Sequence, residues 1–291
     1  MNIAKFNHKI REIRDDRARG ASELARCCLM VLAQAARELP ADSVTEWRRG
    51  LLRLSAELAD SRPSMTPVRN LLGCWQAEMS GETVLDLAAA RQAAAERAEE
   101  LIARSQQAAR TSAVHAAQLL GAGRTLMTHS LSSTVLETCR LLKDRGLRMI
   151  ITESRPLEEG RRLARQLSAW KVATTYITEA QMALFVARAD AVLVGADSVL
   201  ADGSVVNKAG TYLLGLAARE QRVPFYVCCE SFKWRKLGEA LPELEEMAPS
   251  ELKLPDWPAV TVRNVYFDIT PARLVSAWID ETGARWPNVR P

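Results

Sequence analysis

Four short segments of this 291-residue chain each place polar or charged side chains directly after an apolar, β-rich run. These segments are His129-Ser130, Glu153-Ser154-Arg155, Gly195-Ala196-Asp197 and Glu230-Ser231. In an open parallel sheet, such residues meet at the edge formed by the carboxyl ends of the strands, where ligands bind. Carboxylates, hydroxyls and an arginine at one edge suit proton transfer and the binding of a phosphorylated small molecule.

Asp197 is the candidate acid/base group. It follows the apolar run 191–194, so its carboxylate is expected at the sheet edge, where it would transfer a proton or bind a hydroxyl. The structural alternative is a helix cap or a turn, which aspartate also favours. The next stretch, Ala201-Asp202-Gly203-Ser204, is typical of a tight hairpin turn.

Two segments suit an anion. Asn207 and Lys208 precede Gly210-Thr211, the expected start of a helix, where free N–H groups and a lysine favour negative charge. Arg155 lies between a strand and a helix for which Pro156 is the expected first residue. Arg155 either binds a phosphate bidentately or is a solvated arginine, and the local sequence favours neither.

Hydroxyl groups gather near residue 130. Ser132 and Ser133 precede another expected helix, where they either cap it or hold phosphate oxygens. His129 beside Ser130 suggests nucleophilic catalysis, but neighbouring residues on a strand point to opposite faces. We therefore do not expect a base–nucleophile pair there.

Residues 1–120 carry the patterns of helices. The stretch 82–120 contains no proline and no glycine, and it is rich in residues with high helix propensity. At about 1.5 Å per residue it predicts one helix on the order of 55 Å long. Arg19-Gly20-Ala21-Ser22 and Ser61-Arg62-Pro63 stand at expected helix starts, where capping is the ordinary role.

The pattern changes after Gly121, where short β-rich runs alternate with amphipathic stretches. The runs are Thr125–Thr128, Arg148–Thr152, Ala173–Ile177, Ala191–Val194 and Val223–Cys228. Such alternation predicts right-handed crossovers and a parallel sheet covered on both faces. The sequence thus predicts an α/β fold of two domains, a helical domain over residues 1–120 and an α/β ligand-binding domain over residues 121–291.

Composition argues against several classes of protein. The net charge is only +4 without a clustered basic face, so nucleic-acid binding is not expected. The six cysteines form no C-x-x-C pair and the three histidines lie far apart, so we expect reduced, mostly buried thiols and no metal site. The N-terminus lacks an apolar signal segment, and no apolar run approaches the roughly 18 residues of a membrane span. We expect a cytoplasmic protein without membrane contact.

Seven segments together resemble one family. The family contains the regulatory subunits of eukaryotic translation initiation factor 2B, methylthioribose-1-phosphate isomerase and ribose-1,5-bisphosphate isomerase. The matching segments are RGASELA (19–25), SRPSMTPVRNLL (61–72), LMTHSLSSTVLE (126–137), ITESRPLEEGRRLARQL (151–167), VLVGADSVLADGSVVNKAGTYLLGLAARE (192–220), VPFYVCCESFKW (223–234) and YFDITPARLVSAWIDETG (266–283). They follow the family's order and cover most of the chain, and the segment 192–220 is the most specific.

The resemblance implies a Rossmann-like C-terminal domain and chemistry without a metal or nicotinamide cofactor. Together with the apolar face of the last expected strand–helix segment, Tyr266–Trp278, it predicts a homodimer formed through the C-terminal half. The isomerases of this family open a furanose 1-phosphate and move a hydrogen between C1 and C2. A residue matching Asp197 and a cysteine carry that chemistry. The remaining matches are to residues that touch substrate: Arg19, Gly20, Ala21, Arg62, Asn207 and Lys208.

Ser130 occupies the position of the catalytic cysteine. A thiol titrates near 8.5, whereas a serine hydroxyl is far less acidic and needs an adjacent base. Two hypotheses follow. The first is a sugar-phosphate isomerase closest to ribose-1,5-bisphosphate isomerase, because SRPS at 61–64 resembles that enzyme. The second is a non-catalytic module, like the initiation-factor subunits, that binds a nucleotide or sugar phosphate and a protein partner.

Overall fold

The computed structural model describes residues 3–79, 86–239, 241, 243–255 and 257–287. By their internal contacts the residues divide into two compact units, 1–107 and 108–291. This division falls inside helix α5 (Leu87–Leu120). The sequence predicts the boundary at the end of that helix, thirteen residues further along. The last turns of α5 belong with the second unit because Ala116, Ala117 and Leu120 are part of its core. A domain boundary after residue 120 stays a prediction.

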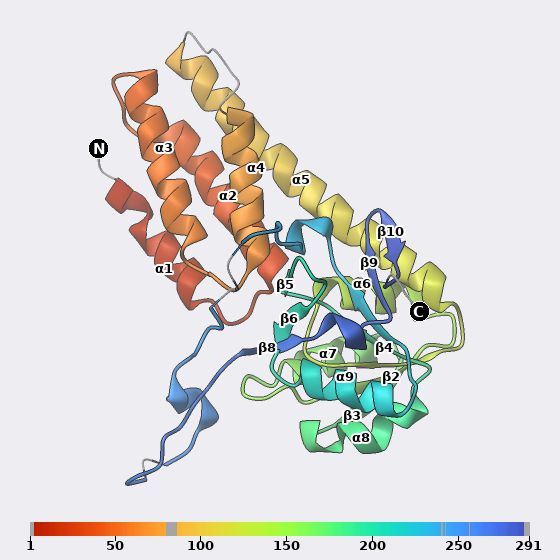
Figure 1. Ribbon diagram of the computed structural model, residues 1–291. Coiled ribbons are helices and arrows are strands. Elements are labelled where there is room, and N and C mark those ends of the chain that lie inside the picture. The colour runs from red at the N-terminus through yellow and green to blue at the C-terminus, as the bar shows by residue number, and fades with distance from the viewer. Residues whose placement is uncertain (1–2, 80–85, 240, 242, 256, 288–291) are drawn as a thin grey trace. The chain divides into compact units, whose positions relative to one another are not determined.

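The first unit is helical, as its sequence predicts (Figure 1). It contains η1 (Ile3–Phe6), α1 (Asn7–Asp15), α2 (Ala21–Glu38), α3 (Val44–Ala59), α4 (Thr66–Met79) and the first part of α5. Two fully buried tryptophans join these helices, because the indole N–H of Trp47 donates to the carbonyl of Ala36 and that of Trp75 to the carbonyl of Ala94, each over 3.0 Å. The expected helix 82–120 is observed from Leu87, and residues 82–85 lie outside the described part of the chain.

The second unit contains a seven-stranded sheet in the order β10-β9-β7-β4-β1-β2-β3. Its strands are β1 (Thr125–Thr128), β2 (Arg148–Thr152), β3 (Ala173–Ile177), β4 (Ala191–Val194), β7 (Phe225–Cys228), β9 (Ala277–Asp280) and β10 (Gly283–Arg285). All neighbours pair in parallel except β9 and β10. The mostly parallel sheet after a helical region confirms the α/β fold class predicted from the sequence.

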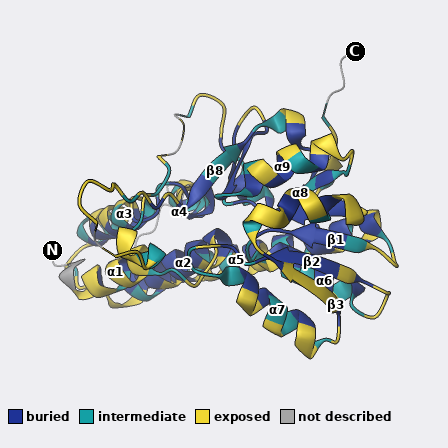
Figure 2. Ribbon diagram, turned by 90° about the horizontal axis from the view of Figure 1, so that it is seen from below, coloured by how far each residue is buried: buried dark blue, intermediate teal, exposed yellow. Residues whose placement is uncertain are grey.

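Two apolar cores cover the two faces of this sheet (Figure 2). Successive residues of a strand alternate between them, so Met127 joins the core under α8 (Met182–Phe185) and α9 (Thr211–Glu220), while Leu126 joins the other. The second core contains residues of α6 (Ser133–Leu142), α7 (Glu159–Ala169) and the end of α5. Five of the six parallel strands, β1 to β4 and β7, have helices between them, which is the βαβ pattern that the alternating runs predicted.

A separate three-stranded sheet pairs β5 (Ser198–Val199), β6 (Val205–Lys208) and β8 (Phe267–Thr270) in antiparallel fashion. The turn between β5 and β6 confirms the hairpin expected at residues 201–204. Gly203 has φ of +86°, and an added Cβ would lie 2.8 Å from the Trp278 ring, so only glycine suits this turn. The 3-10 turns of this unit are η2 (Glu179–Gln181), η3 (Val186–Arg188), η4 (Ser231–Lys233), η5 (Pro249–Leu252) and η6 (Ala272–Leu274).

Two expectations about elements are wrong. Pro156 does not open a helix, because α7 begins at Glu159 and the preceding residue, Glu158, has a left-handed φ of 55°. The segment Tyr266–Trp278 is not a strand followed by a helix: after β8 and η6 it enters β9, which pairs with β7. Its apolar side chains, including Val275 and Trp278, are buried within this unit, so they do not form a free face for dimerisation.

Candidate functional site

The candidate residues of the second unit lie at one edge of the sheet. Strands β7, β4, β1 and β2 are parallel neighbours, so the residues that follow them, Glu230, Asp197, Ser130 and Arg155, leave the sheet at the same edge. Since β1 lies directly between β4 and β2, Ser130 has Asp197 on one side and Arg155 on the other along the edge.

Two glycines show how closely the loops meet. A Cβ on Gly195 would lie 2.3 Å from Oγ of Ser132, so the loop after β1 is in contact with the segment that ends in Asp197. A Cβ on Gly210 would lie 2.9 Å from Nε2 of His129, so the turn that follows Asn207 and Lys208 rests on the same loop. The loop after β1 therefore touches both other predicted parts of the site.

His129 holds this loop through both of its ring nitrogens. The residue is buried, Nδ1 lies 2.7 Å from Oγ1 of Thr152, and Nε2 lies 2.9 Å from the carbonyl oxygen of Ala209. A carbonyl oxygen only accepts, so Nε2 carries the hydrogen and Nδ1 accepts from the Thr152 hydroxyl. Burial lowers the pKa of His129 to about 4, so the ring is neutral near pH 7.

Ser154 completes the chain of hydrogen bonds. Its Oγ lies 3.0 Å from Oγ1 of Thr152 and accepts the backbone N–H of Ser130 over 2.8 Å. Ser130 itself has a left-handed φ of 66°, so the bond fixes a backbone conformation that serine rarely adopts. Both ring nitrogens of His129 are bonded to other groups, so His129 is not the base of Ser130. This agrees with the expectation from the sequence that the two residues do not form a base–nucleophile pair.

Ser132 and Ser133 start α6 without capping it. Ser132 is the N-cap residue, but its side chain makes no cap hydrogen bond and lies instead 2.9 Å from Oγ1 of Thr134. Ser133 is exposed. Their predicted contact with phosphate oxygens stays a prediction.

Asp197 is neither a helix cap nor part of a turn. It precedes β5, its side chain is half-buried, and its backbone N–H donates to the carbonyl of Val206 over 2.9 Å. The carbonyl oxygen of the preceding residue, Ala196, accepts a hydrogen bond from the ammonium of the buried Lys233 over 2.6 Å. Lys233 was not among the predicted site residues.

Asn207 and Lys208 lie on β6 and are both buried. The ammonium of Lys208 lies 2.7 Å from Oε1 of Glu159, the first residue of α7, and 4.1 Å from the centre of the Tyr266 ring. The side-chain amide of Asn207 donates to Oγ1 of Thr211 over 3.0 Å. The lysine is thus a paired, desolvated cation, and any anion that binds here competes with Glu159.

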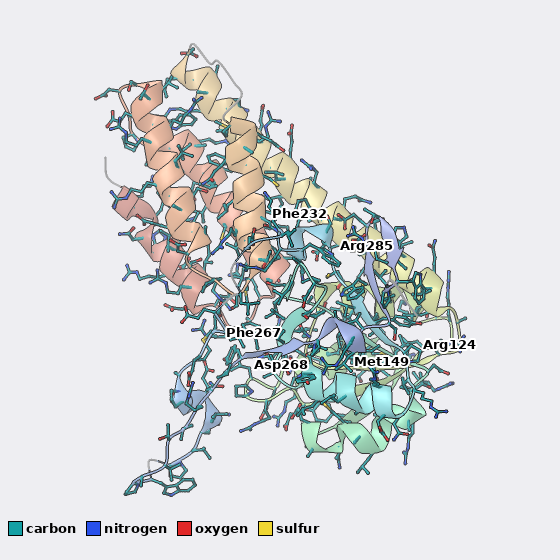
Figure 3. The ribbon with its side chains drawn as sticks, viewed as in Figure 1. Arg124, Met149, Phe232, Phe267, Asp268 and Arg285 are labelled. Carbon is teal, nitrogen blue, oxygen red and sulfur yellow. The ribbon has the colours of Figure 1, made fainter. Side chains whose placement is uncertain are left out.

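Asp268 is a further residue that the sequence analysis missed. It pairs with Asn207 across β6 and β8, and Figure 3 labels it beside Phe267. Its Oδ2 accepts the N–H groups of Gly210, over 2.7 Å, and of Tyr212, over 3.1 Å, at the start of α9. Burial raises the pKa of Asp268 to about 6, although these two hydrogen bonds oppose the rise.

Arg155 projects from the loop after β2. Its side chain is 45% exposed, and Nη1 lies 3.5 Å from Oε1 of Glu158. This exposure leaves the arginine accessible to a ligand. Its ion pair with Glu158 is weak, because an exposed ion pair contributes little to stability. The structure is compatible with both interpretations of this residue.

In the first unit, the predicted arginines meet at Asp16. Nε of Arg19 lies 2.9 Å from the Asp16 carboxylate, and Nη1 of the buried Arg62 donates to the Asp16 carbonyl over 2.9 Å. Burial opposes the charge of Asp16, but the N–H groups of Arg19 and Ala18 and the two arginines together lower its pKa. Asp16 was not predicted.

Gly20 and Ala21 continue this cluster into α2. Gly20 is the N-cap residue of the helix and Ala21, its first residue, is buried. A second guanidinium nitrogen of Arg19, Nη1, donates to Sγ of Cys27 over 2.7 Å. Arg19, Gly20, Ala21 and Arg62 thus form one local cluster.

The described residues contain neither a metal-binding cluster nor a membrane-spanning helix. No group of three or more His, Cys, Asp or Glu side chains there has the arrangement of a metal site. No described helix has the length and apolarity needed to cross a membrane. All six cysteines are free thiols, and five of them are buried.

Comparison with known proteins decides the family. A model of the initiation factor 2 subunit family matches residues 17–287. The chain belongs to this family. A Pyrococcus furiosus protein, provisionally named translation initiation factor eIF-2B subunit 2-like, is 35% identical over 96% of this chain and 95% of its own length. The ribose 1,5-bisphosphate isomerase of Archaeoglobus fulgidus is 33% identical over 96% of this chain and 88% of its own length.

Solved structures agree with this assignment. The translation initiation factor eIF-2B of Pyrococcus horikoshii OT3 is 36% identical, with a TM-score of 0.84 over 98% of both chains. The 5-methylthioribose 1-phosphate isomerase of the same organism, at 22% identity, shares the fold with a TM-score of 0.77 over 96% of this chain and 84% of the isomerase. The family predicted from the seven segments is confirmed. The relatives of the chain include proteins named as initiation factors and proteins named as isomerases.

The hydrogen-bond chain through Thr152 predicts a loss of stability in Thr152→Val. Valine keeps the shape of threonine but leaves Nδ1 of the buried His129 without its donor, which typically costs about 1–3 kcal/mol. We expect a fall of that size in the free energy of unfolding, measured by urea denaturation. Thr175→Val, on the exposed face of the neighbouring strand β3, is the matched control and should change it by less than about 0.5 kcal/mol. Equal effects would show that the hydroxyl of Thr152 is dispensable.

The raised pKa of Asp268 predicts a pH dependence of stability. Because the folded-state pKa of about 6 exceeds the usual 3.8, the folded state binds the proton more tightly, and stability declines as pH rises from 4 through 6. Asp268→Asn keeps an acceptor for Gly210 and Tyr212 but does not ionise. We expect it to remove about 1–3 kcal/mol of the decline between pH 4 and pH 7 in thermal or urea unfolding. Asp144→Asn, at an 80% exposed side chain, should leave the decline unchanged.

Proposed function

We propose that this protein is an aldose–ketose isomerase of sugar phosphates, closest in substrate to ribose 1,5-bisphosphate isomerase. The observation that carries the proposal is the contact between two loops at the sheet edge. The loop with Ser130 and the segment with Asp197 follow neighbouring strands, and Gly195 lies against Ser132. In this proposal the half-buried Asp197 carboxylate and the Ser130 hydroxyl both face the region where the two loops meet.

In this proposal Asp197 carries the proton. In the reaction the bond between C1 and the ring oxygen breaks, the hydrogen on C2 moves to C1, and C2 becomes a carbonyl. The proton that the C2 hydroxyl gives up is balanced by the proton that the ring oxygen takes, so no external oxidant is needed. A carboxylate beside a buried ammonium suits this task, because it can take up a proton from the sugar and release it again within the site, without a water molecule as carrier. Ser130 orients a sugar hydroxyl, since a hydroxyl without a neighbouring base does not supply a proton near neutral pH.

Phosphate binding falls to the cationic groups at the same edge. We propose Arg155 and Lys208 for one phosphate, with Asn207, Ser132 and Ser133 on sugar or phosphate oxygens. Arg19 and Arg62 of the first unit, with Gly20 and Ala21, are proposed for phosphate and sugar on the family pattern. Their present bonds to Asp16 fix their guanidinium groups.

The second candidate function is a non-catalytic module that binds a nucleotide or sugar phosphate and signals to a protein partner. Ser130 at the position of the family's catalytic cysteine favours this candidate, as does the initiation-factor name of a relative at 35% identity. A cytoplasmic homodimer is proposed for either function. Burial of the Tyr266–Trp278 side chains removes the apolar face first expected to form the dimer, so the family pattern alone now supports it.

The decisive experiment follows ketose formation by NMR with ribose 1,5-bisphosphate. Asp197→Asn removes the proton-transfer group and should lower the rate by about 10²–10⁴-fold. Ser130→Ala should lower it by about fivefold, the equivalent of one neutral hydrogen bond of about 1 kcal/mol. Ser130→Cys introduces the thiol of the family pattern, which titrates near 8.5 and so exchanges protons far more readily than a hydroxyl, and should raise the rate.

The matched control is Asp190→Asn, at the residue that directly precedes β4, whereas Asp197 follows that strand. It should retain the rate if the folded protein is recovered. An unchanged rate in Asp197→Asn would show that another group transfers the proton. If wild type and Ser130→Cys both bind the bisphosphate and neither isomerises it, the non-catalytic module is the better account.

Phosphate recognition is tested by calorimetric titration with ribose 1,5-bisphosphate, AMP and free ribose. We expect binding only of phosphorylated compounds, with affinity that falls as salt is added. Arg155→Ala removes a charge-assisted contact and should weaken binding about tenfold or more. Arg124→Ala removes the same charge at the opposite end of β1 and should not (Figure 3). Equal affinity for free ribose would contradict a phosphate site.

A further inference from the structure

Two oppositely charged residues are buried on the segment that follows β7, and one of them, Lys233, interacts with Asp197. Glu230 is 1% exposed and Lys233 is 5% exposed, and both lie on the segment that follows β7 and forms η4. Nζ of Lys233 lies 3.6 Å from Oε2 of Glu230. Figure 3 labels Phe232, which lies between them in the sequence. Charged groups are buried this deeply only when they are paired or have a function.

Glu230 is poorly satisfied for a buried carboxylate. Neither of its oxygens makes a hydrogen bond to any residue that the structure describes. A carboxylate in such a place destabilises a fold unless its charge is needed, and an apolar side chain would pack there more favourably. Packing therefore does not explain Glu230, which invites a functional explanation.

Lys233 links Glu230 to the candidate site. Its ammonium donates to the carbonyl of Ala196 over 2.6 Å, so it holds the peptide that leads directly into Asp197. Burial disfavours its charge, but the negative charges of Glu230 and Asp197 outweigh burial and raise the pKa of Lys233. The lysine is thus a permanent cation at pH 7 that interacts with two carboxylates.

We propose that Lys233 is a positioning residue for Asp197, and that Glu230 sets how strongly its positive charge acts on the Asp197 carboxylate. This inference rests on the proposed role of Asp197 in proton transfer. Glu230 balances the charge of Lys233 in both states of Asp197. The buried group therefore has a net charge of −1 when Asp197 is ionised and zero when Asp197 is protonated, so neither state leaves a buried ammonium unbalanced.

Other charged groups near this segment have partners of their own. Arg235 pairs with Glu239, and the buried Asp280 pairs with Arg285, whose guanidinium lies 2.8 Å from Oδ2. Glu281 accepts both the backbone N–H and the hydroxyl of Ser231. Burial raises the pKa of Cys229 well above its usual value, so this thiol is neutral. Lys233 is then the charge that interacts directly with Asp197, and Glu230 acts on Asp197 through Lys233.

The proposal predicts opposite effects from two nearly isosteric changes. Lys233→Met removes the cation and leaves two carboxylates together, so Asp197 should titrate at higher pH, by about one pH unit or more. Glu230→Gln leaves the cation to Asp197 alone, so Asp197 should titrate at lower pH. The double variant, Lys233→Met with Glu230→Gln, removes one charge of each sign and should bring the midpoint back toward that of the wild type.

The test is NMR of the full chain labelled with carbon-13 at the aspartate carboxyl groups, with the Asp197 signal assigned from Asp197→Asn. Lys236→Met, at an exposed lysine three residues further along, is the matched control and should not move the midpoint. Shifts in opposite directions support the proposal, as does a return in the double variant. No shift, or shifts of the same sign, would overturn it. If Lys233→Met does not fold, Glu230→Gln and the double variant still decide the question.

This measurement needs no substrate, so it separates the inference from the proposed function. If the titration moves as expected but no isomerase activity is found, the proposed function is wrong and the charge relation stands. If the wild type isomerises the sugar and the titration does not move, Lys233 has only a structural role. In an active enzyme, the acid limb of the profile of kcat/KM against pH should follow the NMR midpoint in each variant.

Discussion

The arrangement of the sheet edge depends on one buried, neutral histidine. His129 accepts from Thr152 of β2 and donates to Ala209 in the turn after β6, so a single ring joins the loop after β1 to a strand and a turn that are far away in the sequence. A side chain with one donor and one acceptor on opposite sides is needed for this, and neutral imidazole provides both. Its low pKa of about 4 keeps that form throughout the physiological range.

The buried cations near this edge of the sheet are paired with carboxylates. Lys208 and Lys233 are both buried, and each has a carboxylate partner, Glu159 and Glu230 respectively. Both lie beside segments proposed to meet the ligand, and removing a partner from a buried ion pair is far more harmful than removing both. The cations are therefore held in place before any anion binds, and an anion that binds at Lys208 competes with Glu159 for its charge.

The sequence predicts the elements that local patterns define, and it misses contacts between distant segments. Strands β1 to β4 match the β-rich runs because their residues favour a buried sheet, and the residues after them could be named without a structure. Asp268 could not, because its partners Gly210 and Tyr212 are more than 50 residues away and meet it only through the β6–β8 pairing. The sequence pattern of the segment Tyr266–Trp278 predicts a strand followed by a helix, but the end of this segment forms part of β9, because the tertiary pairing with β7 outweighs local propensity.

Ser130 shows why the fold alone does not separate the two kinds of relative. Its left-handed backbone is held by Ser154, which is in turn bonded to Thr152, so the position of the side chain is set by the framework rather than by its own chemistry. Exchanging oxygen for sulfur there would alter acidity and leave geometry almost unchanged. A catalytic and a sensing protein can therefore share this edge, and the difference between them lies in which group holds a proton at neutral pH.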